Sequence, residues 1–227
     1  MTSPLKIGLM VPVNNTTMEG ELLAYLPPGT RCTTLRIPRG KGLLATDTID
    51  AYIDGALALA ASFNPAEIDI VAYGCTAAGF ISGPARDAAL ARAINRLTGK
   101  PVVTTASAMI EALQDVKAND IALVTPYLDG VNTQLIAFLA NSAIKVRAFD
   151  SLYAADVDAL GRIQADEVDA IARRTMNDAC GALFIACSQL PAMSLLDDLR
   201  SDFGKPVFSS IQATAWQMRR VLGRQTA

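Results

Sequence analysis

The feature that most constrains the fold of this chain is an internal repeat, with a period of just over one hundred residues. The segment Lys6-Ile-Gly-Leu-Met-Val-Pro is echoed by Asp120-Ile-Ala-Leu-Val-Thr-Pro. Later in each half, Gly99-Lys-Pro-Val-Val-Thr-Thr is echoed by Gly204-Lys-Pro-Val-Phe-Ser-Ser. Solenoid repeats are far shorter than this. The repeat therefore predicts two related lobes.

A cysteine followed by a hydroxyl residue occupies the same place in both halves. Cys75-Thr follows the apolar run that begins at Ile70, and Cys187-Ser follows the run that begins at Ala182. The alternative to a true repeat is that all strands of an α/β protein look alike. The matching order of the Cys-[Thr/Ser] and Gly-Lys-Pro markers favours the repeat.

Short apolar runs alternate with longer amphipathic stretches, a pattern typical of parallel sheets covered by helices on both faces. The predicted strands are Ile7–Val11, Arg31–Ile37, Ile68–Tyr73, Val102–Thr104, Ile121–Thr125, Lys145–Phe149, Ala182–Ala186 and Val207–Ser209. The predicted helices are Thr17–Leu26, Thr48–Phe63, Pro84–Leu97, Ala106–Leu113, Val131–Ala140, Ala165–Met176, Met193–Phe203 and Ala213–Leu222.

These elements predict the α/β class, with two pseudo-symmetric lobes. Each lobe is expected to hold a parallel, mainly four-stranded sheet flanked by helices, with the active site in the cleft between the lobes. We assign residues 1–98 plus 206–227 to lobe A and residues 99–205 to lobe B.

Composition narrows the possible chemistry. The 227 residues include no histidine, so the usual general base and the commonest metal ligand are absent. Among the remaining side chains that transfer protons, cysteine titrates nearest to neutral pH. Four cysteines in a chain of this size, without a targeting signal, indicate free thiols in a reducing cytoplasm. They form no Cys-x-x-Cys pair, which disfavours a zinc knuckle or a redox dithiol.

Several classes of partner are disfavoured. The net charge is -2 without a basic stripe, so we expect no nucleic-acid partner. No apolar run is long enough to span a bilayer, and the first residues predict a strand where a secretory signal would have a longer apolar segment. We therefore expect a cytoplasmic protein without a membrane partner. Apolar helices such as Ala51–Phe63 are compatible with a homo-oligomer.

The segment Arg39-Gly-Lys-Gly-Leu-Leu-Ala contains two cations and two glycines. Its glycine spacing matches neither a P-loop nor a GxGxxG motif, so no nucleotide cofactor is expected, and no other cofactor or metal is expected either. The segment is interpreted either as a solvated surface loop or as a loop that attracts an anionic substrate and closes over it.

Cys75 and Cys187 both lie where a predicted strand ends, and ligands of open α/β sheets bind beyond the carboxyl ends of strands. If the lobes face each other, one thiol stands on each wall of a shared cleft. Two opposed thiols can move a proton from one face of a carbon next to a carboxylate to the other face. Alternatively, one thiolate adds to an activated double bond, and the adduct rotates before elimination.

The alternative role of a cysteine on an apolar strand is a small core hydrophobe, and we interpret Cys32 and Cys180 in that way. Thr76 and Ser188, which follow the two candidate thiols, are expected to hold a carboxylate beside each sulfur together with helix N-terminal N–H groups. Both can also cap helices.

Four segments carry a family resemblance, which covers nearly the whole chain. They are Pro12-Val-Asn-Asn-Thr-Thr-Met-Glu, Tyr73-Gly-Cys-Thr, Thr125-Pro-Tyr-Leu-Asp-Gly-Val-Asn and Ala186-Cys-Ser-Gln-Leu-Pro. The chain resembles the aspartate/glutamate racemase superfamily, and within it the branch of maleate cis-trans isomerases and arylmalonate decarboxylases. The resemblance implies the two-lobed fold and a cleft for a small carboxylate or dicarboxylate.

The resemblance also implies roles for single residues. Cys75 matches the nucleophile of the isomerases, and Cys187 matches its opposed acid or base. Asn15 matches a substrate-binding asparagine, although Asn and Thr at this place can equally cap a helix. Thr76 and Tyr127 match donors around one substrate carboxylate, and Tyr127 is otherwise a half-buried aromatic residue.

Some positions depart from the isomerases. Val157 stands where they carry asparagine, Ala77 where serine is usual, and Gln189 where asparagine is usual. We keep Ala77, Val157 and Ser188 among the expected substrate contacts. Valine is the decarboxylase-like residue and offers a carboxylate no hydrogen bond, which favours a substrate with one carboxylate or with a bulkier apolar second group. Cys75 favours the isomerases, because the decarboxylases have glycine there.

The leading hypothesis is a cofactor-independent isomerase, either a cis-trans isomerase or a racemase, that acts on a small carboxylic acid. The second hypothesis is an arylmalonate-type decarboxylase in which Cys187 donates the proton. A third is a non-catalytic carboxylate-binding module. A fourth, a redox sensor, requires the two sulfurs to lie within disulfide reach.

Overall fold

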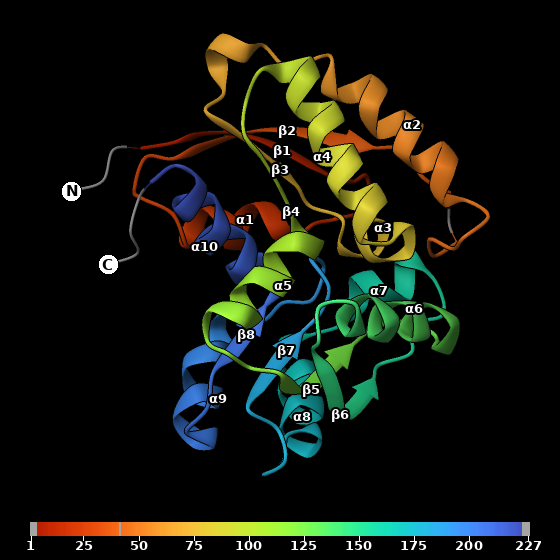
Figure 1. Ribbon diagram of the computed structural model, residues 1–227, viewed down its shortest axis with the longest axis vertical. Helices are drawn as coiled ribbons and strands as arrows, with labels where there is room; N and C mark the ends of the chain where they lie inside the picture. The colour runs from red at the N-terminus through yellow and green to blue at the C-terminus, as the bar shows by residue number, and fades with distance from the viewer. Residues whose placement is uncertain (1–3, 41, 224–227) are drawn as a thin grey trace.

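The computed structural model describes residues 4–40 and 42–223 and has two lobes, one above the other in Figure 1. The first sheet contains β1 (Lys6–Pro12), β2 (Arg31–Ile37), β3 (Ile70–Tyr73) and β4 (Val102–Thr104). The second contains β5 (Asp120–Thr125), β6 (Lys145–Ser151), β7 (Ala182–Ile185) and β8 (Val207–Ser209). All eight predicted strands are confirmed, with ends that differ by two residues or fewer.

The two sheets have the same topology. The strand orders are β2-β1-β3-β4 and β6-β5-β7-β8, and all neighbouring strands are parallel. The inner strands β3 and β7 are wholly buried, because their residues are apolar on both faces. The edge strands β2 and β6 include exposed polar residues. The shared order confirms the internal repeat and the predicted α/β class.

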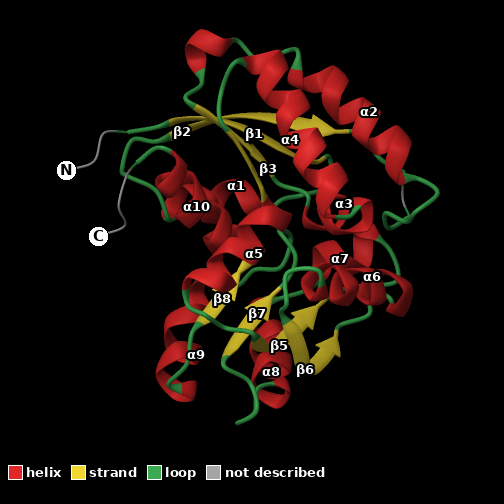
Figure 2. Ribbon diagram, in the orientation of Figure 1, coloured by secondary structure: helices red, strands yellow, loops and turns green. Residues whose placement is uncertain are grey.

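Helices cover both sheets, as Figure 2 shows. In the first half they are α1 (Met18–Ala24), α2 (Ile49–Ala60), α3 (Thr76–Ser82), α4 (Pro84–Thr98) and α5 (Thr105–Asp115). In the second half they are α6 (Asp129–Ala140), α7 (Val157–Arg162), α8 (Ala165–Thr175), α9 (Leu196–Phe203) and α10 (Ser210–Val221). Short 3-10 turns occupy Pro65–Glu67 and Met193–Leu195. The predicted helix ranges do not include α7, which has six residues, or α3, which has seven and was expected only as a helix N-terminus after Cys75.

The strand pairing corrects the lobe boundaries assigned from the sequence. β4 pairs with β3, with Val102 beside Val71, and β8 pairs with β7, with Val207 beside Leu183. Residues 99–104 therefore belong with the first sheet, and residues 206–209 with the second. The chain changes lobe after each Gly-Lys-Pro strand, because that strand completes a sheet. The last helix, α10, does pack against α1 of the first lobe.

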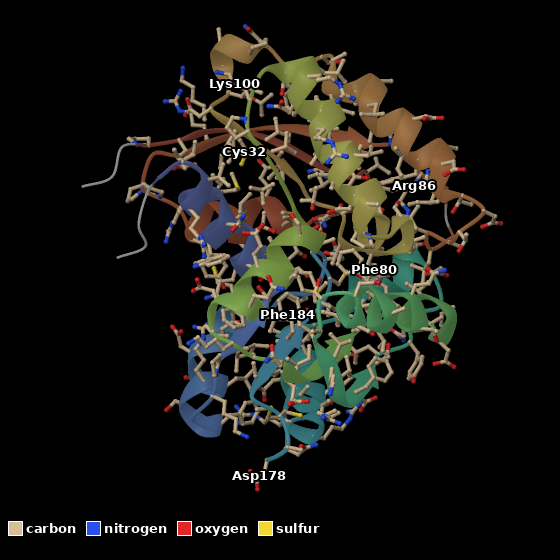
Figure 3. The ribbon with its side chains drawn as sticks, in the orientation of Figure 1. Cys32, Phe80, Arg86, Lys100, Asp178 and Phe184 are labelled. Atoms are coloured by element: carbon tan, nitrogen blue, oxygen red, sulfur yellow. The ribbon has the colours of Figure 1, made fainter. Side chains whose placement is uncertain are left out.

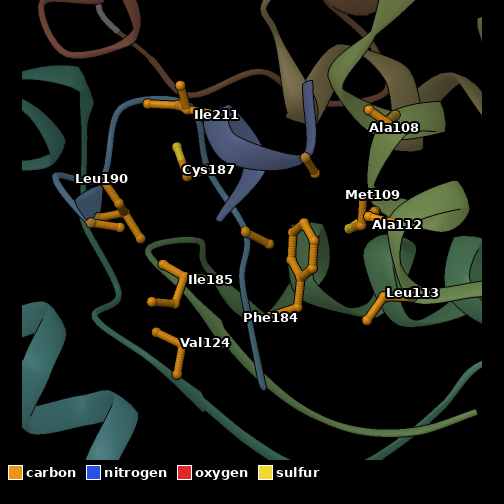
Figure 4. Packing of buried hydrophobic residues seen from close by; sticks show 14 of the residues in the cluster. Ala108, Met109, Ala112, Leu113, Val124, Phe184, Ile185, Cys187, Leu190 and Ile211 are labelled. Carbon is orange, nitrogen blue, oxygen red and sulfur yellow. The ribbon is translucent and has the colours of Figure 1, made fainter. Parts of the chain in front are cut away.

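The helices that follow these strands pack against each other and join the lobes. α5 and α10 form the most extensive helix–helix contact. Met109 and Leu113 of α5 lie beside Phe184 of β7, as Figure 4 shows. In Figure 3, Phe80 lies where the lobes meet, whereas Arg86, Lys100 and Asp178 lie toward the outside. No helix in the described ranges is long and apolar enough to cross a membrane.

Candidate active site

A cavity lies between the lobes at the carboxyl ends of the strands. It contains about 470 Å³ of space not occupied by protein atoms, part of it open to solvent. Its lining comes from both halves: Pro12, Asn14, Asn15, Arg39, Leu43, Leu44, Cys75, Thr76, Ala77, Tyr127, Val131, Leu160, Cys187, Ser188 and Gln189. Both candidate thiols therefore face one cavity, as the pseudo-symmetry predicts.

Cys75 lies between β3 and α3, at the residue that caps the helix. Gly74 lets this turn lie close to β1 and α1, since a Cβ atom there would collide with Met18 Sδ and lie 2.9 Å from Val11 Cγ1. The backbone N–H groups of Ala77 and Ala78, at the start of α3, lower the pKa of Cys75 and so favour its ionised form.

Cys187 follows β7 but does not precede a helix. The chain makes a turn at Ser188 and Gln189 and reaches the next α-helix at Leu196. The expected helix N-terminus beside this sulfur is therefore wrong. Pro191 interrupts the chain soon after the thiol, and proline removes a backbone donor. The turn still supplies an N–H group, because Gln189 N lies 3.4 Å from Cys187 Sγ.

Burial raises the pKa of both thiols. At Cys75, the neighbouring Tyr52 hydroxyl and the Arg39 charge act in the opposite direction and favour the thiolate. At Cys187, the Tyr127 hydroxyl favours the thiolate, whereas a charge on Cys75 would disfavour it. The two sulfurs thus influence each other, so ionisation of one opposes ionisation of the other.

Two buried hydroxyl groups are available to a ligand. Thr76 Oγ1 and Tyr127 OH have no hydrogen-bond partner of good geometry, although the Tyr127 hydroxyl lies beside Cys187. An edge-on contact with Phe80, at 5.5 Å between ring centroids, holds the Tyr127 ring. Buried donors without partners are costly unless a ligand satisfies them. Their position fits a substrate carboxylate.

The side chain of Asn15 lines the cavity and also joins the lobes. Its Nδ2 donates to Ser188 O at 3.1 Å and to Ser188 Oγ at 3.2 Å, while its Oδ1 accepts from Thr17 N and Met18 N. Ser188 Oγ in turn donates to Gly74 O at 2.8 Å. Asn15 therefore caps the start of α1 and also fixes the Ser188 turn beside Cys187.

Comparison with known proteins places the chain in a family. The model of the family described as arylmalonate decarboxylase matches residues 7–227. The chain belongs to the arylmalonate decarboxylase family. Its resemblance to the branch that also contains maleate isomerases is confirmed by the relatives that follow.

Relatives of both kinds cover most of this family member. The arylmalonate decarboxylase of Bordetella bronchiseptica is 30% identical over 187 residues, which is 81% of this chain and 78% of the relative. The maleate isomerase of Nocardia farcinica is 29% identical over 231 residues, which is 96% of this chain and 90% of the relative.

Solved structures agree with the fold. A cysteine mutant of the Nocardia farcinica maleate cis-trans isomerase, solved with a covalently bound succinylcysteine intermediate, superposes with a TM-score of 0.90 and 26% identity. The match covers 98% of this chain and 94% of that one.

The structure brings together all but one of the site residues predicted from this family resemblance. Asn15, Thr76, Ala77, Tyr127 and Ser188 line the cavity with the two thiols; the exception is Val157. Val157 is the first residue of α7 and is buried, and Leu160, one helical turn later, reaches the cavity in its place.

Sequence reasoning missed several groups of this site. The apolar wall of Leu43, Leu44, Val131 and Leu160 has no distinguishing sequence pattern. Tyr52 was expected only as part of a helix, and the approach of its hydroxyl to Cys75 depends on how α2 packs. Arg39 has a signal in the sequence, because two cations in a glycine-containing loop indicate a segment that can attract an anionic substrate.

Cys32 and Cys180 lie outside the cavity, and no disulfide links any of the four cysteines, all of which lie in the described part of the chain. Burial raises the pKa of Cys32 to about 12. Within the described part of the chain, no group of three or more Cys, Asp or Glu side chains is arranged to hold a metal ion.

Proposed function

We propose that this protein is a cofactor-independent cis-trans isomerase that converts maleate, or a closely similar unsaturated dicarboxylate, into its trans isomer. The observation that carries the proposal is the pair of thiols on opposite walls of one cavity, beside the unpartnered hydroxyls of Thr76 and Tyr127. Relatives named maleate isomerase cover nearly the whole chain, and a related isomerase forms a succinylcysteine.

In the proposed mechanism, the Cys75 thiolate attacks one alkene carbon of the substrate. A sulfur–carbon bond forms, the π bond breaks, and its electron pair moves toward the neighbouring carboxylate as an enediolate. Cys187 donates a proton to the second carbon. The former double bond is now single and rotates. Cys187 then takes a proton back, the sulfur–carbon bond breaks, and the trans alkene leaves with Cys75 restored as thiolate.

Thr76 and Tyr127 are assigned to the carboxylate on which negative charge develops. Aimed donors in a site shielded from water stabilise such charge strongly. Asn15 and Ser188 hold the wall that carries Cys187, through the hydrogen bonds that join them across the cleft. Ala77 leaves space at the cavity wall.

Proton NMR of maleate tests this function directly, because the alkene protons of the two isomers resonate at different positions. We expect the wild-type protein to form fumarate, and Cys75→Ala and Cys187→Ala each to lower kcat/KM by at least about 100-fold. Cys32→Ala is the matched control and is expected to retain activity. If the wild-type protein isomerises neither maleate nor a closely similar unsaturated dicarboxylate, the proposal is overturned.

Arylmalonate decarboxylation is the second candidate. It is favoured by the 30% identity to the Bordetella enzyme and by the apolar wall of the cavity. In that reaction Cys187 alone would protonate the enediolate left by loss of carbon dioxide. Carbon dioxide release from phenylmalonate that survives Cys75→Ala, without any isomerisation of maleate, would select this candidate over the first.

Three further points stay with this proposal: the non-catalytic alternative, the compartment and the oligomeric state. Ligand binding with no turnover of any of these acids would point to the carboxylate-binding module.

The free state of all four cysteines supports a reducing compartment, and we propose the cytoplasm. A homo-oligomer also stays a proposal, which the elution volume of the purified protein tests.

A further inference from the structure

A dicarboxylate substrate poses a problem that the predicted site residues do not solve. Thr76 and Tyr127 supply donors for one carboxylate. Val157 stands where the isomerases carry a polar residue that could bind the second carboxylate, but its side chain is apolar and does not line the cavity. A second carboxylate left without a partner in a largely apolar cavity would pay a large desolvation cost.

Among the described residues that line the cavity, Arg39 is the only one with a formally charged side chain. It follows β2, and the lining contains no aspartate or glutamate. One guanidinium nitrogen, Nη2, donates to Gly42 O at 2.6 Å, which fixes the head of the side chain. No ion pair in the described ranges involves Arg39.

The Nε atom of Arg39 is shielded from solvent and has no hydrogen-bond partner. A buried charged donor without an acceptor is unfavourable, and a carboxylate is the acceptor that matches guanidinium geometry best. Leu43 and Leu44 line the same cavity, and apolar side chains near the guanidinium strengthen such a contact.

The Arg39 charge reaches both lobes. It lowers the pKa of Cys75 and Tyr52 in the first lobe, and it acts in the same direction on Tyr127 in the second, against the effect of burial. The guanidinium therefore lies within electrostatic range of the thiol proposed as nucleophile and of the donor proposed for the first carboxylate.

We propose that Arg39 binds the second carboxylate of the substrate and thereby makes the site selective for dicarboxylates over monocarboxylates. This inference rests on the proposed function, which supplies the first carboxylate and the thiols. It also gives a physical reason why valine is compatible with a dicarboxylate substrate at position 157, because the partner of the second carboxylate comes from the loop after β2.

Calorimetric binding of two saturated acids tests the inference without turnover. Succinate has two carboxylates, and butyrate has the same chain length with one. We expect the wild-type protein to bind succinate more tightly than butyrate. In Arg39→Leu, the affinity for succinate should fall by about tenfold or more, while the affinity for butyrate should change by less than about twofold. Arg39→Lys keeps the positive charge but loses the planar guanidinium with its paired N–H donors. Its affinity for succinate should lie between those of the wild-type protein and Arg39→Leu.

Arg86→Leu is the matched control, since it removes the same charge from an exposed position on α4 and is expected to change neither affinity. Equal weakening of succinate and butyrate by Arg39→Leu would assign Arg39 a structural role and overturn the inference. No preference of the wild-type protein for succinate, or an unchanged succinate affinity in Arg39→Leu, would overturn it as well.

Maleate turnover separates this inference from the proposed function. If the wild-type protein isomerises maleate and Arg39→Leu leaves KM unchanged, the function stands and the inference fails. If maleate is not isomerised but succinate binding depends on Arg39, the function fails and the dicarboxylate site stands.

Discussion

At the residue scale, two thiols of the same sequence context differ in their surroundings. Cys75 lies near Tyr52 and Arg39, and both favour its ionised form. Cys187 has the Tyr127 hydroxyl as its neighbour, but no cation is among the groups that lower its pKa. This asymmetry supports Cys75 as the nucleophile and Cys187 as the proton donor in the first step.

Replacement of Tyr52 by phenylalanine tests this asymmetry. Loss of the hydroxyl removes a group that lowers the pKa of Cys75, so the apparent pKa for alkylation of Cys75 by iodoacetamide should rise by about one unit or less. Tyr25→Phe, at a surface cleft away from the thiols, is the matched control. An unchanged alkylation profile in Tyr52→Phe would show that Tyr52 does not act on this thiol.

The pH dependence of activity follows from the same burial. Because burial raises the pKa of Cys75, most of the nucleophile is a neutral thiol near pH 7, and its thiolate fraction grows as pH rises. We expect kcat/KM to increase with pH to beyond about 8.5, the ordinary value for a free thiol. A profile that is already flat from about pH 6 upward would contradict a raised pKa.

At the scale of elements, the sequence pattern predicted much of the fold. Apolar runs such as Ile70–Tyr73 are short and continuous, so the strand ends and both cysteines were placed within a few residues. The failures have physical causes. Helix α7 is shorter than two turns of apolar periodicity, and the lobe boundary depends on whether the strand after Gly-Lys-Pro pairs backward or forward, which composition does not record.

The candidate site was predicted less completely than the fold. Position along the chain places Thr76 beside Cys75, and the family resemblance places Tyr127 near the thiols, but the direction of each side chain depends on packing. Asn15 has its amide engaged by Ser188 and by α1, and Arg39 turns into the cavity from a loop. Neither orientation has a periodic signal in the sequence.

The loop that carries Tyr127 depends on one buried asparagine of α6. Asn132 Nδ2 donates to Tyr127 O at 2.7 Å, and its Oδ1 accepts from Thr125 Oγ1 at 2.6 Å. Ser151 Oγ also contacts both of these groups, at 2.6 Å from Tyr127 O and 3.0 Å from Thr125 Oγ1. We expect Asn132→Ala to reduce the free energy of unfolding by about 1–3 kcal/mol in urea titrations, because each of the two buried groups loses one of its two partners. Thr133→Ala, exposed on the same helix, should stay within about 0.5 kcal/mol. Equal stability of the two variants would contradict the role of Asn132.

At the scale of the whole molecule, the cavity depends on hydrogen bonds that join the lobes on either side of it. Gln189 Oε1 accepts from Thr16 N at 2.9 Å, and Gln189 Nε2 donates to Thr16 Oγ1 at 3.0 Å. Glu21 accepts from Ala192 N and Met193 N further along the same seam. These contacts fix the distance between the walls, and a fixed distance is what two cooperating thiols require.

Gln189→Ala tests whether the seam matters for turnover. The variant should lose about 1–3 kcal/mol of unfolding free energy and, at temperatures where it is fully folded, show a lower kcat for maleate because the walls are less well held. Gln114→Ala, an exposed residue of α5, should match the wild type in both measurements. An unchanged kcat in folded Gln189→Ala would show that these hydrogen bonds between the lobes do not contribute to catalysis.

The most direct test of the two-thiol account is to locate a covalent intermediate on the chain. Cys187→Ser protein is incubated with maleate, digested, and its cysteine-containing peptides are analysed by mass spectrometry. The account predicts a succinyl adduct on the Cys75 peptide and none on the peptides of Cys32, Cys180 or residue 187. An adduct confined to another cysteine would contradict the account. Turnover of maleate by Cys75→Ala at the wild-type rate would contradict it as well.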